Sequence, residues 1–369
     1  MLGVLAIVSL TAVFLTRAAS KMPDFEVYYK AGARATLAEP LYRDSDGHFQ
    51  FKYLPAFALI AAPIARVPLR AAKAMWFAAS AVLMVVLLAL SLAALPDLRR
   101  PAPILLLLTF LAMAKFYAHE LVLGQVNLLF AALVTLALVW MRRGRETAAG
   151  ALLALAVLVK PYAVIFAPWA AMRRRKGAFL AMAAGVVVLL IVPALRYGWQ
   201  GNIALLADWW HTVTASSPPN QMNQDNVSLV AMFTKWLGPD SQAPLLAAGV
   251  AAILLVLTAI VMAGRGALKV PDTLEGAMLL TLIPLLSPQG WDYVFLISTP
   301  AVMLLINYTP ELPRGLRYAT IAAIAIVALA IYDVMGRDLY RTFMRSSVIT
   351  VLVVVEVAAL VALRFRRVA

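Results

Sequence analysis

The chain has 369 residues, of which 63% are hydrophobic and only 14% are charged. A soluble globular domain is about 45–50% apolar and about 25% charged, so this composition excludes a soluble protein and predicts an integral membrane protein. The net charge of +14 does not point to nucleic acid as a partner, because in a membrane protein the positions of the basic residues matter more than their sum.

Apolar segments follow one another along the chain with no polar insert of domain size. A bilayer core needs about 20 apolar residues per helix, and fewer where protein neighbours shield the helix ends. The candidate helices cover residues 1–16, 73–95, 103–118, 124–141, 147–159, 161–172, 178–195, 243–263, 274–286, 291–307, 317–332 and 347–363. The sequence therefore predicts one all-α polytopic membrane domain, residues 1–369, with about twelve transmembrane helices.

Two apolar stretches are interrupted, 147–172 at Lys160-Pro161 and 274–307 at residues 287–290, and each is either a tight hairpin or a single broken helix. If each interruption is a turn, six basic clusters share one side of the membrane. They are Arg99/Arg100, Arg142/Arg143/Arg145, Arg173/Arg174/Arg175/Lys176, Arg265/Lys269, Arg314/Arg317 and Arg364/Arg366/Arg367. By the positive-inside rule this side is cytoplasmic and holds both termini, in a cell (inner or plasma) membrane.

The remaining segments fit this orientation. Residues 1–16 have an alternative as a cleaved signal peptide, although no basic residue precedes their apolar run. Residues 54–67 are too short to span, and we expect a re-entrant or interfacial segment there. The polar loops 17–53 and 196–242 then lie on the extracytoplasmic side with most of the acidic residues, so any chemistry is expected on that side.

The first polar loop begins with an amphipathic pattern. Phe25, Tyr28, Tyr29 and Gly32 recur at helical spacing, which predicts a helix lying on the membrane surface. Asp24 stands at the start of this helix, where an isolated aspartate is more often the N-cap than a catalytic group.

Other polar residues allow both a functional and an ordinary role. The second loop carries an Asn/Gln-rich run over residues 220–226, whose amides suit either a hydroxyl-rich ligand or a solvated loop. Polar residues close to membrane depth are functional by default. They are Lys115, His119, Glu120, Gln125, Asn127, Lys160, Asp292 and Glu356. Lys160 either faces a phosphate or snorkels to the headgroups.

Taken in order, these motifs resemble glycosyltransferase family 87, which comprises polyprenol-phosphate-sugar-dependent membrane mannosyltransferases and relatives of the GT-C superfamily. The matching stretches are residues 24–32 with Leu41-Tyr42, residues 51–59 with Pro63, residues 124–129, residues 160–169 with the arginines that follow, and residues 287–293. Many relatives have His where this chain has Asp292-Tyr293, which leaves the acceptor and any auxiliary base open.

The resemblance implies a GT-C-like helical bundle with extracytoplasmic loops and short interfacial helices. It implies a hexosyltransferase that moves mannose from a polyprenyl-phosphate donor to a glycolipid or other glycan acceptor with inversion. The family's proposed general base carries over to Asp24. The expected substrate-binding residues are Lys160, Lys21, Arg34, Gln125, Asn127, Tyr28, Tyr53, Trp291 and Asp292. No cofactor is expected, although outer-face carboxylates leave a divalent cation such as Mg²⁺ as an alternative.

Two other functions compete with a transferase. A flippase for lipid-linked sugars, or a solute transporter, also has many helices and buried polar residues. A transport path, however, needs polar residues at the midplane and on both sides, whereas here they concentrate on one side. A scaffold for other envelope proteins explains neither Lys160 nor the polar loops.

Overall fold

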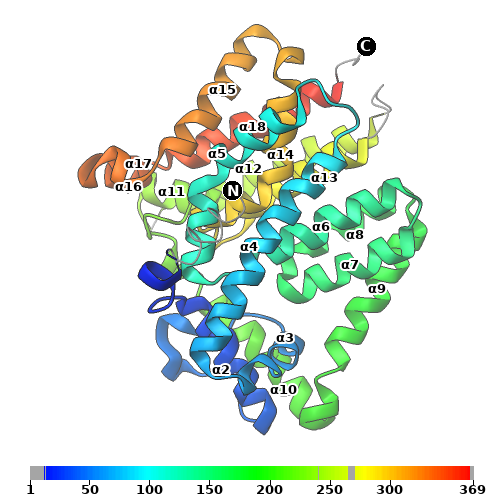
Figure 1. Cartoon of the computed structure of the whole chain (residues 1–369), viewed down its shortest axis with the longest axis vertical. Coiled ribbons are helices and arrows are strands. Elements are labelled where there is room, and N and C mark those ends of the chain that lie inside the picture. Colours follow the sequence, from blue (N-terminus) through cyan, green and yellow to red (C-terminus); the bar gives the residue numbers. More distant parts are fainter. Residues whose placement is uncertain (1–11, 13, 240, 265–270, 366–369) are drawn as a thin grey trace.

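The structure is a computed structural model that describes residues 12, 14–239, 241–264 and 271–365. These residues are helical almost throughout, and the only extended pairing among them is an isolated antiparallel bridge between Asn226 and Trp291. The long helices pack side by side, while α2 (Pro23–Leu37), α3 (Pro55–Ala61) and α10 (Ala194–Ala215) gather at the lower end of the molecule (Figure 1). The all-helical fold class expected from the sequence is confirmed.

The other helices complete the bundle. The α-helices are α4 (Leu69–Ala94), α5 (Ala102–Leu123), α6 (Asn127–Arg142), α7 (Glu146–Val159), α8 (Phe166–Met172), α9 (Lys176–Ile191), α11 (Leu229–Leu237), α12 (Ala243–Ala263), α13 (Pro271–Leu286), α14 (Thr299–Tyr308), α15 (Arg314–Leu329), α16 (Tyr332–Met335), α17 (Arg337–Arg345) and α18 (Val348–Phe365). The short helices are η1 (Phe14–Ala18), η2 (Asp44–Phe49), η3 (Ile64–Arg66), η4 (Pro161–Ile165), η5 (Pro218–Asn220), η6 (Asp292–Ser298) and η7 (Thr309–Glu311).

Five helical segments of the described chain are long and apolar enough to cross a membrane. They are α4, α5, α12, the continuous segment Asp292–Glu311 and α18. α9 and the helix after it make a sixth if this pair, bent by 89°, is one span. The expected count of about twelve is therefore not shown, because α6, α7 and residues 161–172 are shorter than the about 20 residues of a bilayer core. The first expected helix, 1–16, falls largely outside the described residues.

Both interrupted stretches are hairpins. Arg175, which follows α8, pairs with Glu146 at the start of α7 over 3.1 Å, so the chain reverses between them, near Lys160. The second stretch returns in the same way, since Thr273 donates to the Ala94 carbonyl at 2.8 Å and Asn307 donates to the Asp97 carbonyl at 3.0 Å. Both ends of this stretch therefore lie at the end of α4, and its turn falls at residues 287–291.

α4 connects the two ends of the molecule. Near its start Lys73 forms an ion pair of 2.7 Å with Glu26 of α2, and at its end the Ala94 carbonyl accepts a hydrogen bond of 2.6 Å from Arg142. Basic clusters gather at this second end, where Arg100 bonds to Ile306, Arg173 and Arg364 bond to Glu275, and Arg175 bonds to Asp272. These clusters thus share one end, as the charge pattern predicts, and α2 lies at the other; Arg265, Lys269, Arg366 and Arg367 lie outside the described residues.

The amphipathic pattern of the first polar loop forms α2, whose apolar side is buried on neighbouring helices. Gly32 allows α3 to approach closely, because a Cβ at this position would lie 2.6 Å from the Ala61 carbonyl oxygen. The apolar segment 54–67 contains only α3 and η3, so it is too short to span a membrane and lies beside α2.

Candidate active site

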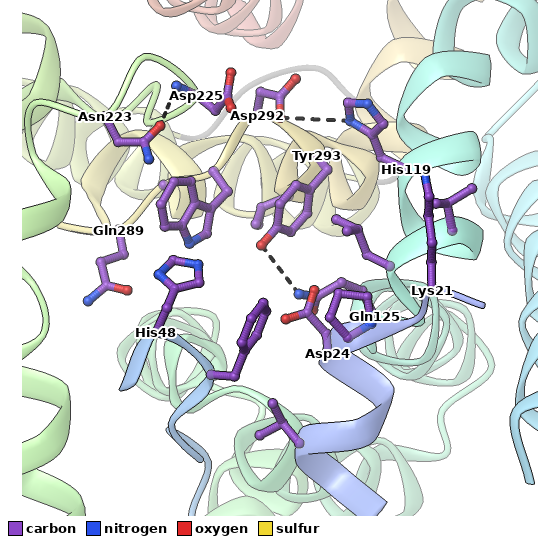
Figure 2. A pocket seen from close by; sticks show the side chains of 18 of the residues that line it. Lys21, Asp24, His48, His119, Gln125, Asn223, Asp225, Gln289, Asp292 and Tyr293 are labelled. Atoms are coloured by element: carbon purple, nitrogen blue, oxygen red, sulfur yellow. Dashed lines mark hydrogen bonds and ion pairs between the residues drawn. The ribbon is translucent and has the colours of Figure 1, made fainter. Parts of the chain in front are cut away.

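A cavity of about 1390 Å³ opens at the α2 end of the bundle. Pockets for small ligands usually measure about 300–1,000 Å³, so two substrate groups can lie in this one together. Its wall includes the first turns of α2 and the last turns of α5, together with Gln125. Both hairpin turns also line it, at residues 159–162 and 287–294. The remaining lining comes from residues 48–53, 223–225 and 331–333 and from Tyr340. Asp24 lies at one end of the cavity and Asp292 at the other, with Tyr293 between them (Figure 2).

Asp24 belongs to the first turn of α2 but does not cap it. Met22 is the N-cap, and no side chain makes a capping hydrogen bond there, so the N-cap interpretation of Asp24 is wrong. The start of α2 is held against the end of α5, because the Met22 N–H donates to the Val122 carbonyl at 3.0 Å. The backbone therefore places Asp24 in the cavity, where its carboxylate contacts Gln125 and does not cap the helix.

Burial and the neighbouring polar side chains have opposite effects on the pKa of Asp24. Burial raises the pKa of the Asp24 carboxyl above its ordinary value of 3.8, while the contact with Gln125 and the charges of Lys160, His48 and Lys52 lower it. Burial is the largest of these effects, so the carboxylate is a stronger base than a solvent-exposed aspartate.

Hydrogen bonds between side chains fix the wall beside Asp24. The hydroxyl groups of Tyr28 and Tyr53 lie 2.8 Å apart, and Tyr28 donates to Gln125 Oε1 at 3.2 Å. Gln125 in turn donates from Nε2 to the Tyr293 hydroxyl at 3.3 Å (Figure 2). This chain of polar groups joins α2, the segment after α5 and the second hairpin turn.

Lys160 supplies a cation at the same end of the cavity. It stands at the first hairpin turn, between α7 and η4, and its ammonium group forms no hydrogen bond or ion pair with the described residues. The carboxylates of Asp24 and Glu120 attract it from a distance. A cation that lines a cavity without a direct partner is suited to an anionic group such as a phosphate.

The structure brings most of the other expected residues to the cavity, but not all. Lys21, Tyr28, Tyr53, Gln125, Trp291 and Asp292 line it, whereas Asn127 and Arg34 do not. Asn127 donates to the buried Glu120 at 2.8 Å. Arg34 is fixed in a two-pronged ion pair with Asp46, at 2.5 and 2.7 Å, which joins α2 to η2. These two residues hold neighbouring elements in place.

The Asp292 end contains residues that sequence reasoning did not assign to a site. Asp225 lies beside Asp292, whose backbone N–H donates to the Asp225 carbonyl at 2.9 Å (Figure 2). His119 Nδ1 is 4.0 Å from Asp292 Oδ1. Tyr293, His48 and Lys52 also line the cavity. The only signal for Asp225 was its place in the Asn/Gln-rich run, because its partner is far away in the sequence.

No group of three or more His, Asp or Glu side chains among the described residues is placed to hold a metal ion.

Comparison with known proteins gives one match. A family model described as Glycosyltransferase family 87 matches residues 51–288, which is more than half of the chain. Asp24 precedes the matched residues, and Asp292 follows them. No curated protein and no solved structure matches the chain.

Proposed function

The chain belongs to glycosyltransferase family 87, and on this premise we propose that it transfers mannose from a polyprenyl-phosphate donor to an extracytoplasmic glycolipid or other glycan acceptor, with inversion at the anomeric carbon. Asp24 is the general base in this proposal. The observation that carries it is the presence, in one cavity, of the Asp24 carboxylate and of the Lys160 ammonium, which has no direct partner among the described residues.

The proposed reaction needs one carboxylate and one cation. The acceptor hydroxyl oxygen attacks C1 of the donor sugar and forms the new C–O bond, while its proton passes to the Asp24 carboxylate. The bond from C1 to the phosphate oxygen breaks, and its electron pair leaves with the lipid phosphate. This leaving group is already a stable anion, so no general acid is required. Lys160 stabilises the charge that develops on the phosphate.

The raised pKa of Asp24 supports its role. A base accepts a proton more readily as its pKa rises, and burial provides this rise without a second carboxylate. The nearby charge of Lys160 lowers the pKa of Asp24 and so opposes part of the rise that burial causes.

The charge pattern supports a location for the site. Because the basic clusters meet at the end of α4 remote from α2, we place that end and both termini in the cytoplasm and the cavity on the extracytoplasmic side of a cell membrane. The chain then acts as one membrane domain with a GT-C-like bundle. A total of about twelve crossings requires that the short helices of the two hairpins also cross the membrane, in addition to the longer spans.

The experiment is sugar transfer from radiolabelled polyprenyl-phosphate-mannose by purified protein, with a membrane-lipid extract as the source of acceptor. Wild type should transfer label, and Asp24→Asn should not, while both variants keep the same elution volume and helical content. Asp338→Asn is the matched control, since this aspartate is 96% exposed on α17 and does not line the cavity. If wild-type proteoliposomes move the lipid-linked sugar across the bilayer without transfer, a transporter replaces the transferase.

A further inference from the structure

The Asp292 end of the cavity holds two carboxylates that lack hydrogen-bond donors. Asp292 is only 2% exposed, and its Oδ2 atom is buried without a partner among the described residues. The Asp225 carboxylate receives no hydrogen bond from them either. His119 Nδ1 remains 4.0 Å from Asp292 Oδ1, which is too long for a hydrogen bond. A buried acceptor such as Asp292 Oδ2 is costly unless a ligand or water donates to it, whereas Asp225 is only half-buried and lines the cavity directly.

The backbone holds these two carboxylates together. The Asp292 N–H donates to the Asp225 carbonyl at 2.9 Å, and the Val227 N–H donates to the Gly290 carbonyl at 2.7 Å. Asn226 and Trp291 form the bridge between the same two segments, and Asn226 Nδ2 also donates to the Pro288 carbonyl at 3.0 Å. The pair of aspartates is therefore built into the fold as a fixed unit.

Two lysines balance the charge of this unit without touching its oxygens. Lys235 donates to the carbonyls of Gln224 and Asn226 at 2.9 and 2.6 Å, and Lys115 donates to the Ala330 carbonyl at 3.2 Å. Among the described residues neither lysine forms an ion pair with Asp225. Burial and Asp292 raise the pKa of Asp225, while His119, Lys235 and Lys115 lower it. The carboxylate oxygens of Asp225 and Asp292 thus receive no hydrogen bond from these lysines, which donate to backbone carbonyls instead.

Such a site favours ligands that donate hydrogen bonds and carry no charge. The negative charge of a phosphate or a uronic acid would lie against two carboxylates, and a cation would lie near Lys115, which lines the same cavity. Hydroxyl groups supply hydrogen-bond donors without charge, and a sugar residue carries several of them. Trp291 lines the same cavity next to Asp292 and offers a flat apolar surface for the ring of a sugar.

We propose that Asp225 and Asp292 form the acceptor subsite, and that it takes an uncharged, hydroxyl-rich sugar residue whose hydroxyl groups donate to both carboxylates. The proposal rests on the proposed function, because it assigns the donor phosphate to Lys160 at the opposite end of the cavity. Asp24 and Asp292 lie on opposite sides of Tyr293, so an acceptor held at this subsite extends past Tyr293 to bring its reacting hydroxyl to Asp24 (Figure 2).

The first test is direct binding to the full chain in lipid nanodiscs, by saturation-transfer NMR with methyl α-D-mannopyranoside as the probe. Asp225→Asn, Asp292→Asn and the double variant keep the size of the side chains; each single variant removes one charged acceptor, and the double variant removes both. We expect affinity for the probe to fall at least about tenfold in the double variant, and to be unchanged in Asp338→Asn. A methyl glucuronide and a methyl glucosaminide should bind more weakly than the mannoside to wild type.

The second test is the transfer assay, in which the variants should raise KM for the acceptor extract at least about tenfold and leave KM for the donor unchanged. Retained probe affinity in the double variant, equal binding of the charged sugars, or an unchanged acceptor KM overturns the subsite. The proposed function fails separately: if wild type binds the probe through both aspartates but transfers no mannose from the polyprenyl phosphate, the sugar subsite stands and the transferase assignment falls.

Discussion

The Tyr28 hydroxyl lies 2.8 Å from the Tyr53 hydroxyl, and this contact joins α2 to the segment before α3, one helical turn from Asp24. The same Tyr28 hydroxyl donates to Gln125 Oε1, so one side chain orients both neighbours of the proposed base. We therefore expect the hydroxyl groups of Tyr28 and Tyr53 to affect the reaction rate by positioning Asp24, and not by contacting the substrate.

Tyr28→Phe should therefore lower kcat with little effect on folding. Its ring stays packed, but Gln125 and Tyr53 lose a partner, and a displaced Asp24 costs about tenfold in rate. Transfer assays at saturating donor measure this loss. Tyr318→Phe, at a residue that is 68% exposed on α15, is the control, and equal kcat in the two variants would contradict a positioning role for Tyr28.

The pH dependence of transfer should reflect the raised pKa of Asp24. The base works only as a carboxylate, so activity falls as pH drops through its pKa, and burial moves this fall above the ordinary value of 3.8. In Lys160→Met a cation that lowers this pKa is lost, so the residual activity should fall at a higher pH than in wild type. Profiles of kcat/KM against pH check the direction, and a shift to lower pH in Lys160→Met would contradict it.

Lys160 should contribute mainly through the donor phosphate. Lys160→Met removes the cation and should reduce kcat/KM for the donor about 10²-fold or more, whereas Lys160→Arg keeps the charge and should recover part of the loss. Lys176→Met, at the basic end of the bundle, controls for loss of a positive charge. Lys160 would be a snorkelling residue without a substrate role if its methionine variant retained wild-type kinetics for the donor.

Gly124 should be intolerant of a side chain because it lies where α5 meets α2. Its φ is +71°, and an added Cβ would lie 2.7 Å from Phe25 Cβ. We expect Gly124→Ala to destabilise the protein by about 1–3 kcal/mol and to lower transfer, because the start of α2 carries Asp24. Thermal unfolding in detergent measures the change. Gly249→Ala in α12 is the matched control, since nothing lies within 4 Å of its Cβ, and it should be neutral or stabilising.

The orientation in the membrane is open to a simple test because the sequence contains no cysteine. Single cysteines at Ser45, near the cavity, and at Arg143, at the basic end, are both exposed. In right-side-out vesicles a membrane-impermeant maleimide should label Ser45→Cys directly, and Arg143→Cys only after permeabilisation. The reverse pattern would place the cavity in the cytoplasm and exclude an extracytoplasmic acceptor.

The sequence by itself determined the class of molecule and much of its organisation. Composition excluded a soluble protein, and helical spacing predicted α2. The charge pattern was consistent with turns at both interrupted stretches but left a broken helix open. The pairing of Arg175 with Glu146 and the contacts of Thr273 and Asn307 near the end of α4 show that both are hairpins. These features depend on residues that are close together in the chain, or on the membrane around the protein. They can therefore be predicted from the order of apolar and charged residues in the sequence.

Only the tertiary structure decided which polar residues face the cavity. Arg34 and Lys160 are both cations beside apolar segments, but Arg34 forms an ion pair with Asp46, while Lys160 has no direct partner in the part of the chain that the structure describes. Asp225 and Asp292 come together because two hairpin turns and a polar loop pack at one end of the bundle. These contacts arise because segments that are distant in the sequence pack closely together. The spacing of residues along the chain therefore does not predict which side chain will be left without a partner.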